Sequence, residues 1–228
     1  MLVPAIAEAK VIPNGVDLTV FCPGEKKEVR ALLQIPQHDK VLLFVANAAK
    51  SNMFKDFRTI HEAALLVGAQ LHTERIRLIV LGERADSERF ENVEIHFIPF
   101  EQDRRMIARY YQAADVYIHA AKSDTFPNTV LEARACGTPT VATAVDGIPE
   151  QVEEGATGFL VPAGDADAMA SRVVQLLMND GLHVQMGAAA AETAVRLFDL
   201  RVQVETYLGW YQHIIERQKS ARTASHAS

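Results

Sequence analysis

The segment VLLFVA at residues 41–46 is the first of five short apolar runs spaced along the chain. Each run is rich in β-branched residues and bounded by turn-forming or charged residues, which is typical of a buried strand rather than a helix. The others are IRLIVL at 76–81, VEIHFI at 93–98, VYIH at 116–119 and TPTVA at 138–142, with a weaker sixth candidate, GFLV, at 158–161.

Amphipathic helical patterns lie between these runs, near residues 54–67, 103–113, 128–135 and 165–178. Strands that alternate with helices at this spacing require right-handed crossovers, which make the sheet parallel and cover both of its faces. The predicted fold is therefore α/β, with a doubly wound, Rossmann-like parallel sheet of about six strands. We assign this domain to residues 11–198, after a short N-terminal segment at 1–10.

The chain beyond the predicted sheet carries only helical signals. Five apolar residues are spaced four, four, three and four positions apart and therefore share one helix face. We expect this C-terminal helix, at 199–219, to pack against its own sheet, and the alternative is that its broad apolar surface covers a second domain. The small, polar tail at 220–228 is expected to be disordered. The five residues are Leu200, Val204, Leu208, Tyr211 and Ile215.

Composition excludes several classes of protein. With 228 residues, 49% of them hydrophobic, the chain can bury a core without disulfides or metal. A net charge of −6 argues against a nucleic-acid partner. Two cysteines exclude a disulfide framework and a four-cysteine zinc site. Because the chain has no signal-peptide pattern and no apolar run long enough to cross a bilayer, we expect a cytoplasmic location.

The segment SDTFPNTVLEARACGTP at 123–139 is the most informative for function, because it follows a predicted strand at the edge where open parallel sheets bind ligands. Pro127 and Asn128 are expected at the start of a helix, with Asn128 able to cap it, and Gly137 just beyond its end. The backbone N–H groups of Phe126–Thr129 then form an anion site suited to a phosphate. The glycine-rich fingerprints of dehydrogenases and P-loop ATPases are absent.

Asp124 and Glu132 lie eight positions apart across this turn. Two such carboxylates can accept hydrogen bonds from sugar hydroxyls on either side of a diphosphate. A capping aspartate and a solvated glutamate would explain the same spacing, so the residues alone leave both interpretations open.

The segment resembles the signature of the GT-B fold retaining glycosyltransferases of family 4, glycosyl transferases group 1, in their C-terminal nucleotide-sugar-binding domain. That family carries an E-x7-E motif ending in a Leu-Glu-Ala helix, and here Asp124-x7-Glu132 is followed by LEA at 131–133 and CGTPTVA at 136–142. Further matching segments cover nearly the whole chain in order. They include VIPNGVDLTVF at 11–21, LIVLG at 78–82, YYQAADVYIH at 110–119 and GIPE at 147–150.

The resemblance implies a role for each matched residue. Asp124 stands where the family's first glutamate contacts the donor sugar, and it is one methylene shorter. Glu132 matches the glutamate that holds the nucleotide ribose, and Phe126, Pro127, Asn128 and Thr129 match the turn whose backbone binds the phosphates.

The resemblance also implies cations for the departing diphosphate. Lys55 matches the family lysine that neutralises it. A basic partner is expected near Asn47, where the sequence offers Asn47 and Lys50. Because lysines and helix-start amides supply the positive charge, no metal or other cofactor is implied.

Several other polar residues are expected to be structural. Asp165-Ala166-Asp167 opens a predicted helix, so N-terminal capping explains it better than metal binding. His119, inside a predicted strand, is a minor candidate for a site contact. His61, His72 and His183 are expected to face solvent, and Cys136 to pack at a helix end.

The function that follows is the donor-binding domain of a retaining glycosyltransferase, which moves a sugar from a nucleotide diphosphate sugar to a hydroxyl. In the family a first domain binds the acceptor, and this chain starts almost at the linker that precedes the second domain. The chain is thus expected to be an excised piece, a natural half that pairs with another chain, or a degenerate module. The alternatives are a nucleotide-sugar binding module without transfer activity and a GT-B fold epimerase fragment. Membrane association in the family usually lies in the acceptor domain.

Overall fold

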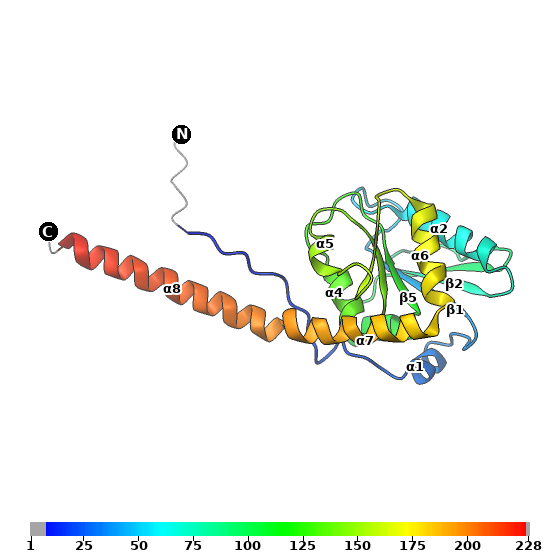
Figure 1. The fold of residues 1–228 in the computed structure, drawn as a ribbon, viewed down its shortest axis with the longest axis horizontal. Helices are drawn as coiled ribbons and strands as arrows, with labels where there is room; N and C mark the ends of the chain where they lie inside the picture. The colour runs from blue at the N-terminus through cyan, green and yellow to red at the C-terminus, as the bar shows by residue number, and fades with distance from the viewer. Residues whose placement is uncertain (1–7, 227–228) are drawn as a thin grey trace.

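A seven-stranded sheet forms the centre of the computed structural model, which describes residues 8–226, with side chains as far as Lys219 (Figure 1). The strand order is β3-β4-β2-β1-β5-β6-β7. The strands are β1 (Lys40–Val45), β2 (Ile76–Leu81), β3 (Glu88–Phe90), β4 (Val93–Ile98), β5 (Val116–His119), β6 (Thr140–Thr143) and β7 (Gly158–Val161).

The sheet is parallel except at β3, so the predicted doubly wound, Rossmann-like topology and its six strands are confirmed. The chain runs outward from β1 to β2 and β4, then returns to β5 on the other side of β1. The strand order therefore reverses between β1 and β5, and the loops that follow these two strands lie at the topological switch point.

Strand β3 is not among the predicted strands. It pairs antiparallel with β4, with Phe90 opposite Val93, and a tight turn joins the two strands. Glu91 in this turn has a φ of 46°, the left-handed region that tight hairpin turns use. Three residues with the sequence ERF, all at least partly exposed, carry no apolar alternation from which a strand could be predicted.

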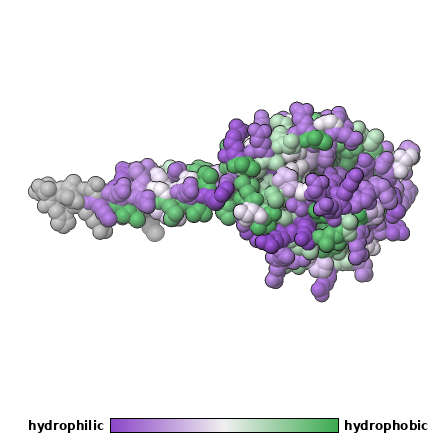
Figure 2. Space-filling view, turned by 90° about the horizontal axis from the view of Figure 1, so that it is seen from below, coloured by the Kyte–Doolittle hydropathy of each residue, from purple (hydrophilic) through white to green (hydrophobic). Residues whose placement is uncertain are grey.

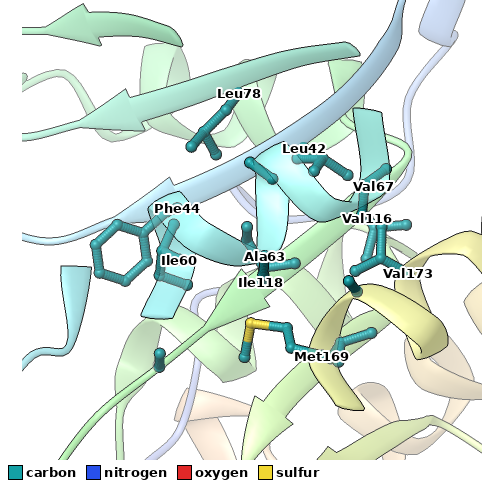
Figure 3. Close-up of a cluster of buried hydrophobic side chains, with 14 of the residues drawn as sticks. Leu42, Phe44, Ile60, Ala63, Val67, Leu78, Val116, Ile118, Met169 and Val173 are labelled. Atoms are coloured by element: carbon teal, nitrogen blue, oxygen red, sulfur yellow. The ribbon is translucent and has the colours of Figure 1, made fainter. Parts of the chain in front are cut away.

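Helices α2 (Phe57–Gln70) and α6 (Ala166–Leu177) cover one face of the sheet. Figure 3 shows Leu42 and Ile118 of the sheet in one cluster with Ile60 of α2 and Met169 of α6, and all four side chains are buried. Burial of an aliphatic side chain of this size contributes about 1.5–3 kcal/mol, which makes this layer a main source of stability.

The opposite face packs against the other helices of the domain. Because side chains alternate along a strand, Val41 and Leu43 of β1 point into this second core together with Tyr117 of β5. Helix α7 contributes Met186 to the first core and Ala194 to the second. The helices are α1 (Lys26–Leu32), α3 (Arg104–Ala113), α4 (Asn128–Ala135), α5 (Ile148–Gln151) and α7 (Asp180–Leu197).

Helix α4 begins and ends as predicted, with one difference. Gly137, with a φ of +72°, follows the C-cap residue Cys136, and Cys136 is buried. Pro127 occupies the N-cap position in an extended conformation, and Asn128 is the first helical residue. The expectation that Asn128 caps the helix is therefore wrong.

Helix α8 (Leu200–His226) projects away from the domain (Figure 1). The expectation that it packs against its own sheet is wrong: Leu208, Tyr211 and Ile215 are 51–56% exposed. Figure 2 shows hydrophobic surface along the projecting helix and where it meets the domain. The tail expected to be disordered is helical as far as His226, and residues 227–228 lie outside the described residues.

The N-terminal segment crosses the start of α8. Val16 N donates to Phe198 O at 2.7 Å, and Leu200 N donates to Val16 O at 3.1 Å. A Cβ on Gly15 would stand 2.6 Å from Leu200 Cα, so only glycine allows the two backbones to approach this closely. Within residues 8–226, no helix has the length and apolar character that crossing a membrane requires.

Candidate functional site

The loops that follow β1 and β5 lie side by side at the switch point. Asp56 N donates to Ala120 O at 3.0 Å, and Lys122 N donates to Phe54 O at 2.8 Å. These two bonds form a short antiparallel bridge that joins Lys55 to Ala121. The bridge brings residues about 65 positions apart to one point at the carboxyl edge of the sheet.

Lys55, Asp124 and His119 form a compact polar cluster at this point. Lys55 Nζ donates to Asp124 Oδ2 at 2.5 Å, and His119 Nε2 lies 3.3 Å from Lys55 Nζ and 3.5 Å from Asp124 Oδ2. The side chains of Lys55 and Asp124 are 14% and 19% exposed, and that of His119 is fully buried. The cluster joins an ammonium group, a carboxylate and an imidazole in an environment with little water.

Burial and pairing act in opposite directions on the pKa of Asp124. Burial raises this pKa, but hydrogen bonds from His119 and Lys55 outweigh the effect, so the net pKa lies below the usual aspartate value. Burial lowers the pKa of His119. At neutral pH the site therefore holds an ionised Asp124 beside a neutral His119.

The loop that follows β6 holds the turn that carries Asp124. Asp146 Oδ2 accepts from Asp124 N at 2.8 Å and from Ser123 Oγ at 2.5 Å. A Cβ on Gly147 would stand only 1.8 Å from Thr125 O, so this position needs glycine. Asp146 and Gly147 in the loop after β6 thus hold the backbone of this turn in place.

The amino end of α4 adjoins this turn. The first N–H groups of a helix have no partner within it, so Asn128 and Thr129 present theirs here, at the positive end of the helix dipole. Pro127 O accepts from the fully buried Gln151 Nε2 at 3.0 Å, which anchors the cap. The hydroxyl of Thr129 is buried and has no hydrogen-bond partner within residues 8–226. The ring of Phe126 packs against Phe198, 6.1 Å between centroids.

Glu132 lies one turn into α4 and accepts from Tyr111 Oη at 3.0 Å. Burial raises the pKa of Glu132 to about 7, although the Tyr111 hydrogen bond and the charge of Arg104 lower it. Glu132 is therefore the opposite of Asp124: its carboxyl group exchanges a proton near neutral pH. The structure does not support the simple alternative of a solvated glutamate.

The structure does not place Lys50 or Asn47 in contact with the Lys55–Asp124 pair. Lys50 Nζ forms an ion pair with Glu88 at 2.9 Å and lies 4.2 Å from the centre of the Phe97 ring. Asn47 O accepts from Asn52 Nδ2 at 3.2 Å. Lys50 and Lys55 nevertheless line one hollow of about 480 Å³ next to the cluster.

Sequence reasoning was correct on one structural carboxylate and wrong on one histidine. Asp165 caps α6 by accepting from Ala168 N at 2.8 Å, as expected. His183, expected to face solvent, is partly buried, with its Nε2 2.8 Å from Asp115 O. Tyr117 Oη lies 2.9 Å from His119 Nδ1, a contact that the sequence did not predict because an aromatic residue in an apolar strand is typical of the core.

Residues 39–179 match the family model for glycosyl transferases group 1, and the chain belongs to this family. Its fold is that of the C-terminal domain of GT-B glycosyltransferases. The C-terminal domain of a glycosyl transferase group 1 family protein (LpcC) from Francisella tularensis superposes with a TM-score of 0.68 at 20% identity, covering 82% of this chain and all of that one.

Two longer proteins are also similar. D-inositol 3-phosphate glycosyltransferase of Mycobacteroides abscessus is 30% identical over 188 residues, 77% of this chain and 40% of that protein. Anabaena HepE, solved in complex with UDP-glucose, has a TM-score of 0.73 at 20% identity, covering 90% of this chain and 57% of HepE. The chain spans about half the length of the curated relatives it matches.

Proposed function

We propose that this chain is the donor-binding part of a retaining glycosyltransferase and that it binds a nucleotide diphosphate sugar at the carboxyl edge of its sheet. The observation that carries the proposal is the Lys55–Asp124–His119 cluster beside the amino end of α4. A cation and free helix-start amides bind a diphosphate, and a carboxylate at their side accepts hydrogen bonds from sugar hydroxyls.

Each residue has a separate task in this proposal. Lys55 and the N–H groups of Asn128 and Thr129 hold the diphosphate. Asp124 faces the sugar, and Glu132, one turn further along α4, accepts from or donates to the ribose hydroxyls. Pro127 and Phe126 shape the turn between the two carboxylates.

The chemistry needs positive charge where the leaving group departs. Cleavage of the bond between sugar and diphosphate leaves negative charge on the phosphate oxygen, and a fixed donor there is worth about 3 kcal/mol. We assign this charge to Lys55 and the α4 amides rather than to a metal, and we propose no covalent residue. The acceptor hydroxyl would be bound by the part of the family enzyme that this chain does not match.

Calorimetric titration tests the donor site. UDP-glucose, GDP-glucose and ADP-glucose are each added to the wild-type chain, and we expect one of them to bind. The Glu132→Ala variant should then lose affinity for that ligand, with less effect when the ribose hydroxyls are replaced by hydrogen. If none of the three ligands binds at millimolar concentration, the donor-site proposal is wrong.

A nucleotide-sugar binding module is the second candidate, because the chain spans only about half of its relatives. An assay of sugar transfer and of donor hydrolysis separates the two. Transfer by the chain alone would show that the acceptor site is also present in these residues. If the chain binds the donor but transfers no sugar, and transfer appears when the other part of a family enzyme is added, the donor-binding role is supported.

A further inference from the structure

The observed ion pair of Lys55 competes with the task that the proposed function gives it. Its Nζ is 2.5 Å from Asp124 Oδ2, and the proposed function needs the same charge at the diphosphate. A diphosphate carries more negative charge than one carboxylate, so a bound donor draws Lys55 away from Asp124. A partly buried carboxylate that loses its cation is destabilised and tends to move or to take up a proton. Asp124 therefore needs a second hydrogen-bond donor when the ligand is bound.

His119 is placed to be that donor. Its Nε2 lies 3.5 Å from Asp124 Oδ2, on the same side as Lys55. His119 is the last residue of β5, and its ring packs between Phe44 and Tyr117, with centroids 6.5 and 5.9 Å away. A fully buried ring on a central strand stays in place when the lysine on the neighbouring loop moves.

Tyr117 is the partner of the other ring nitrogen of His119. Tyr117 Oη is 2.9 Å from His119 Nδ1, and both side chains are fully buried. Burial raises the pKa of Tyr117, so its hydroxyl remains protonated and can donate to Nδ1. A neutral imidazole that accepts at Nδ1 carries its proton at Nε2, the nitrogen that faces Asp124.

We propose that the Tyr117–His119 pair positions the Asp124 carboxylate for the donor sugar when Lys55 turns to the diphosphate. In the free protein Lys55 holds Asp124 and lies 3.3 Å from His119 Nε2, and in the complex His119 Nε2 takes the place of Lys55 at Asp124. This inference rests on the proposed function. It gives Tyr117 and His119 a positioning role, which the contact between Asp124 and Lys55 alone does not require.

The test compares the affinity for a glucose conjugate with the affinity for the same nucleoside diphosphate without sugar. The probes are UDP-glucose and UDP, or the GDP or ADP pair if the wild type binds that nucleotide. In His119→Leu we expect the ratio of the two affinities to fall about tenfold, the effect of one hydrogen bond to a charged group. His119→Gln, whose amide N–H can replace Nε2–H, should restore most of it. Damage to the fold alone would lower both affinities and leave their ratio unchanged.

Two further measurements guard against a variant that fails to fold. Tyr117→Phe removes only a hydroxyl and should lower the ratio about threefold. Ile118→Val, a buried change in the same strand, should leave it unchanged. In ¹⁵N spectra of the wild type with the diphosphate bound we expect His119 with its proton on Nε2, assigned by its loss in His119→Gln.

The outcomes are distinguishable. If the wild type binds none of the diphosphates, the proposed function fails and this inference fails with it. If the wild type binds, but the ratio is unchanged in both His119→Leu and Tyr117→Phe, only the positioning role is wrong. A proton on Nδ1 of His119 with the diphosphate bound would also overturn it.

Discussion

The two ends of strand β5 carry the same pair of residue types in two different settings. At the amino end, Asp115 pairs with Lys26 at 2.9 Å, and beyond the carboxyl end Asp124 pairs with Lys55 at 2.5 Å. Asp115 has further partners: Arg30 at 2.8 Å and the backbone N–H of Val41 at 2.7 Å. The amino-end cluster joins α1, β1 and β5 into a closed structural unit.

The carboxyl end differs in the number of charged partners. Lys55 forms an ion pair with Asp124 and lies 3.3 Å from a neutral His119, and both Lys55 and Lys26 line hollows of about 480 Å³. Burial acts on both aspartates to raise their pKa. The charges of Lys26 and Arg30 bring the pKa of Asp115 below the usual value, and hydrogen bonds from His119 and Lys55 do the same for Asp124. The pKa direction therefore does not separate a structural aspartate from a candidate site aspartate. The number of charged partners separates them: Asp115 pairs with both Lys26 and Arg30, whereas Asp124 pairs with Lys55 beside a neutral His119.

The largest expected effect is on stability, at the amino end. Asp115→Asn leaves the buried Arg30 guanidinium without a counter-charge, which should lower the free energy of unfolding by about 3 kcal/mol. Urea unfolding measures the loss. Asp124→Asn, the same change at the other end, should cost less, because it removes one ion pair, with Lys55, where Asp115→Asn removes two, with Lys26 and Arg30. Equal losses in the two variants would contradict the structural role of the amino-end cluster.

The second effect is on binding, at the carboxyl end. Lys55→Ala should weaken binding of the nucleoside diphosphate about 30-fold, corresponding to about 2 kcal/mol for the loss of one charge-assisted contact. Lys26→Ala is the matched control: it removes the lysine of the other cluster and should leave this affinity unchanged. A similar loss in both variants would mean that the two lysines act through stability or net charge alone.

The third effect is a pH dependence at Glu132. Its pKa of about 7 in the folded protein lies above the ordinary value of 4.5, so folding favours the protonated form. The stability that this provides is present below pH 4.5 and is lost as the pH rises through about 7. Glu132→Gln, which keeps an acceptor for Tyr111, should therefore gain about 1.7 kcal/mol over wild type between pH 5 and pH 6.5.

Urea unfolding at the two pH values measures this gain. Glu192→Gln, an exposed change on α7, serves as the control and should show no comparable dependence on pH. If Glu132→Gln and wild type change in parallel with pH, the Glu132 carboxyl group titrates as an ordinary exposed glutamate.

The sequence predicts the sheet well because its signal is local. Each of the six predicted strands is a short apolar run, and α4 is bounded by a proline and a glycine. The placement of α8 is not a local property. Apolar residues at helical spacing indicate that one face of the helix is to be covered, but they do not indicate which part of a molecule covers it. Here Leu208 and Tyr211 remain more than half exposed.

The candidate site likewise contains residues that the sequence predicts and contacts that it does not. Lys55 and Asp124 are predicted from the family motif and lie in contact, whereas Lys50 is paired with Glu88. Glu88 belongs to the short hairpin strand β3, which carries no apolar pattern, so the sequence does not predict that Glu88 pairs with Lys50. His119 and Tyr117 face each other because the two residues are separated by one position in a strand and thus point to the same face.

The smallest expected effect identifies which lysine serves the diphosphate. In the free protein Asp124 competes with a ligand for Lys55, so Asp124→Asn should release this competition and tighten binding of the bare nucleoside diphosphate about threefold. The same variant should weaken the glucose conjugate relative to the diphosphate, because a carboxylate facing the sugar is lost. Calorimetry with both ligands measures the two changes.

Glu88→Gln is the matched control, since it releases Lys50 from its own carboxylate. If Lys50 is held away from the ligand, Glu88→Gln leaves the diphosphate affinity unchanged while Asp124→Asn raises it. Tighter binding in Glu88→Gln but not in Asp124→Asn would assign the diphosphate to Lys50, as the expected basic partner near Asn47 would require. Because both variants remove one negative charge beside the same hollow, a general electrostatic effect would tighten binding equally in the two.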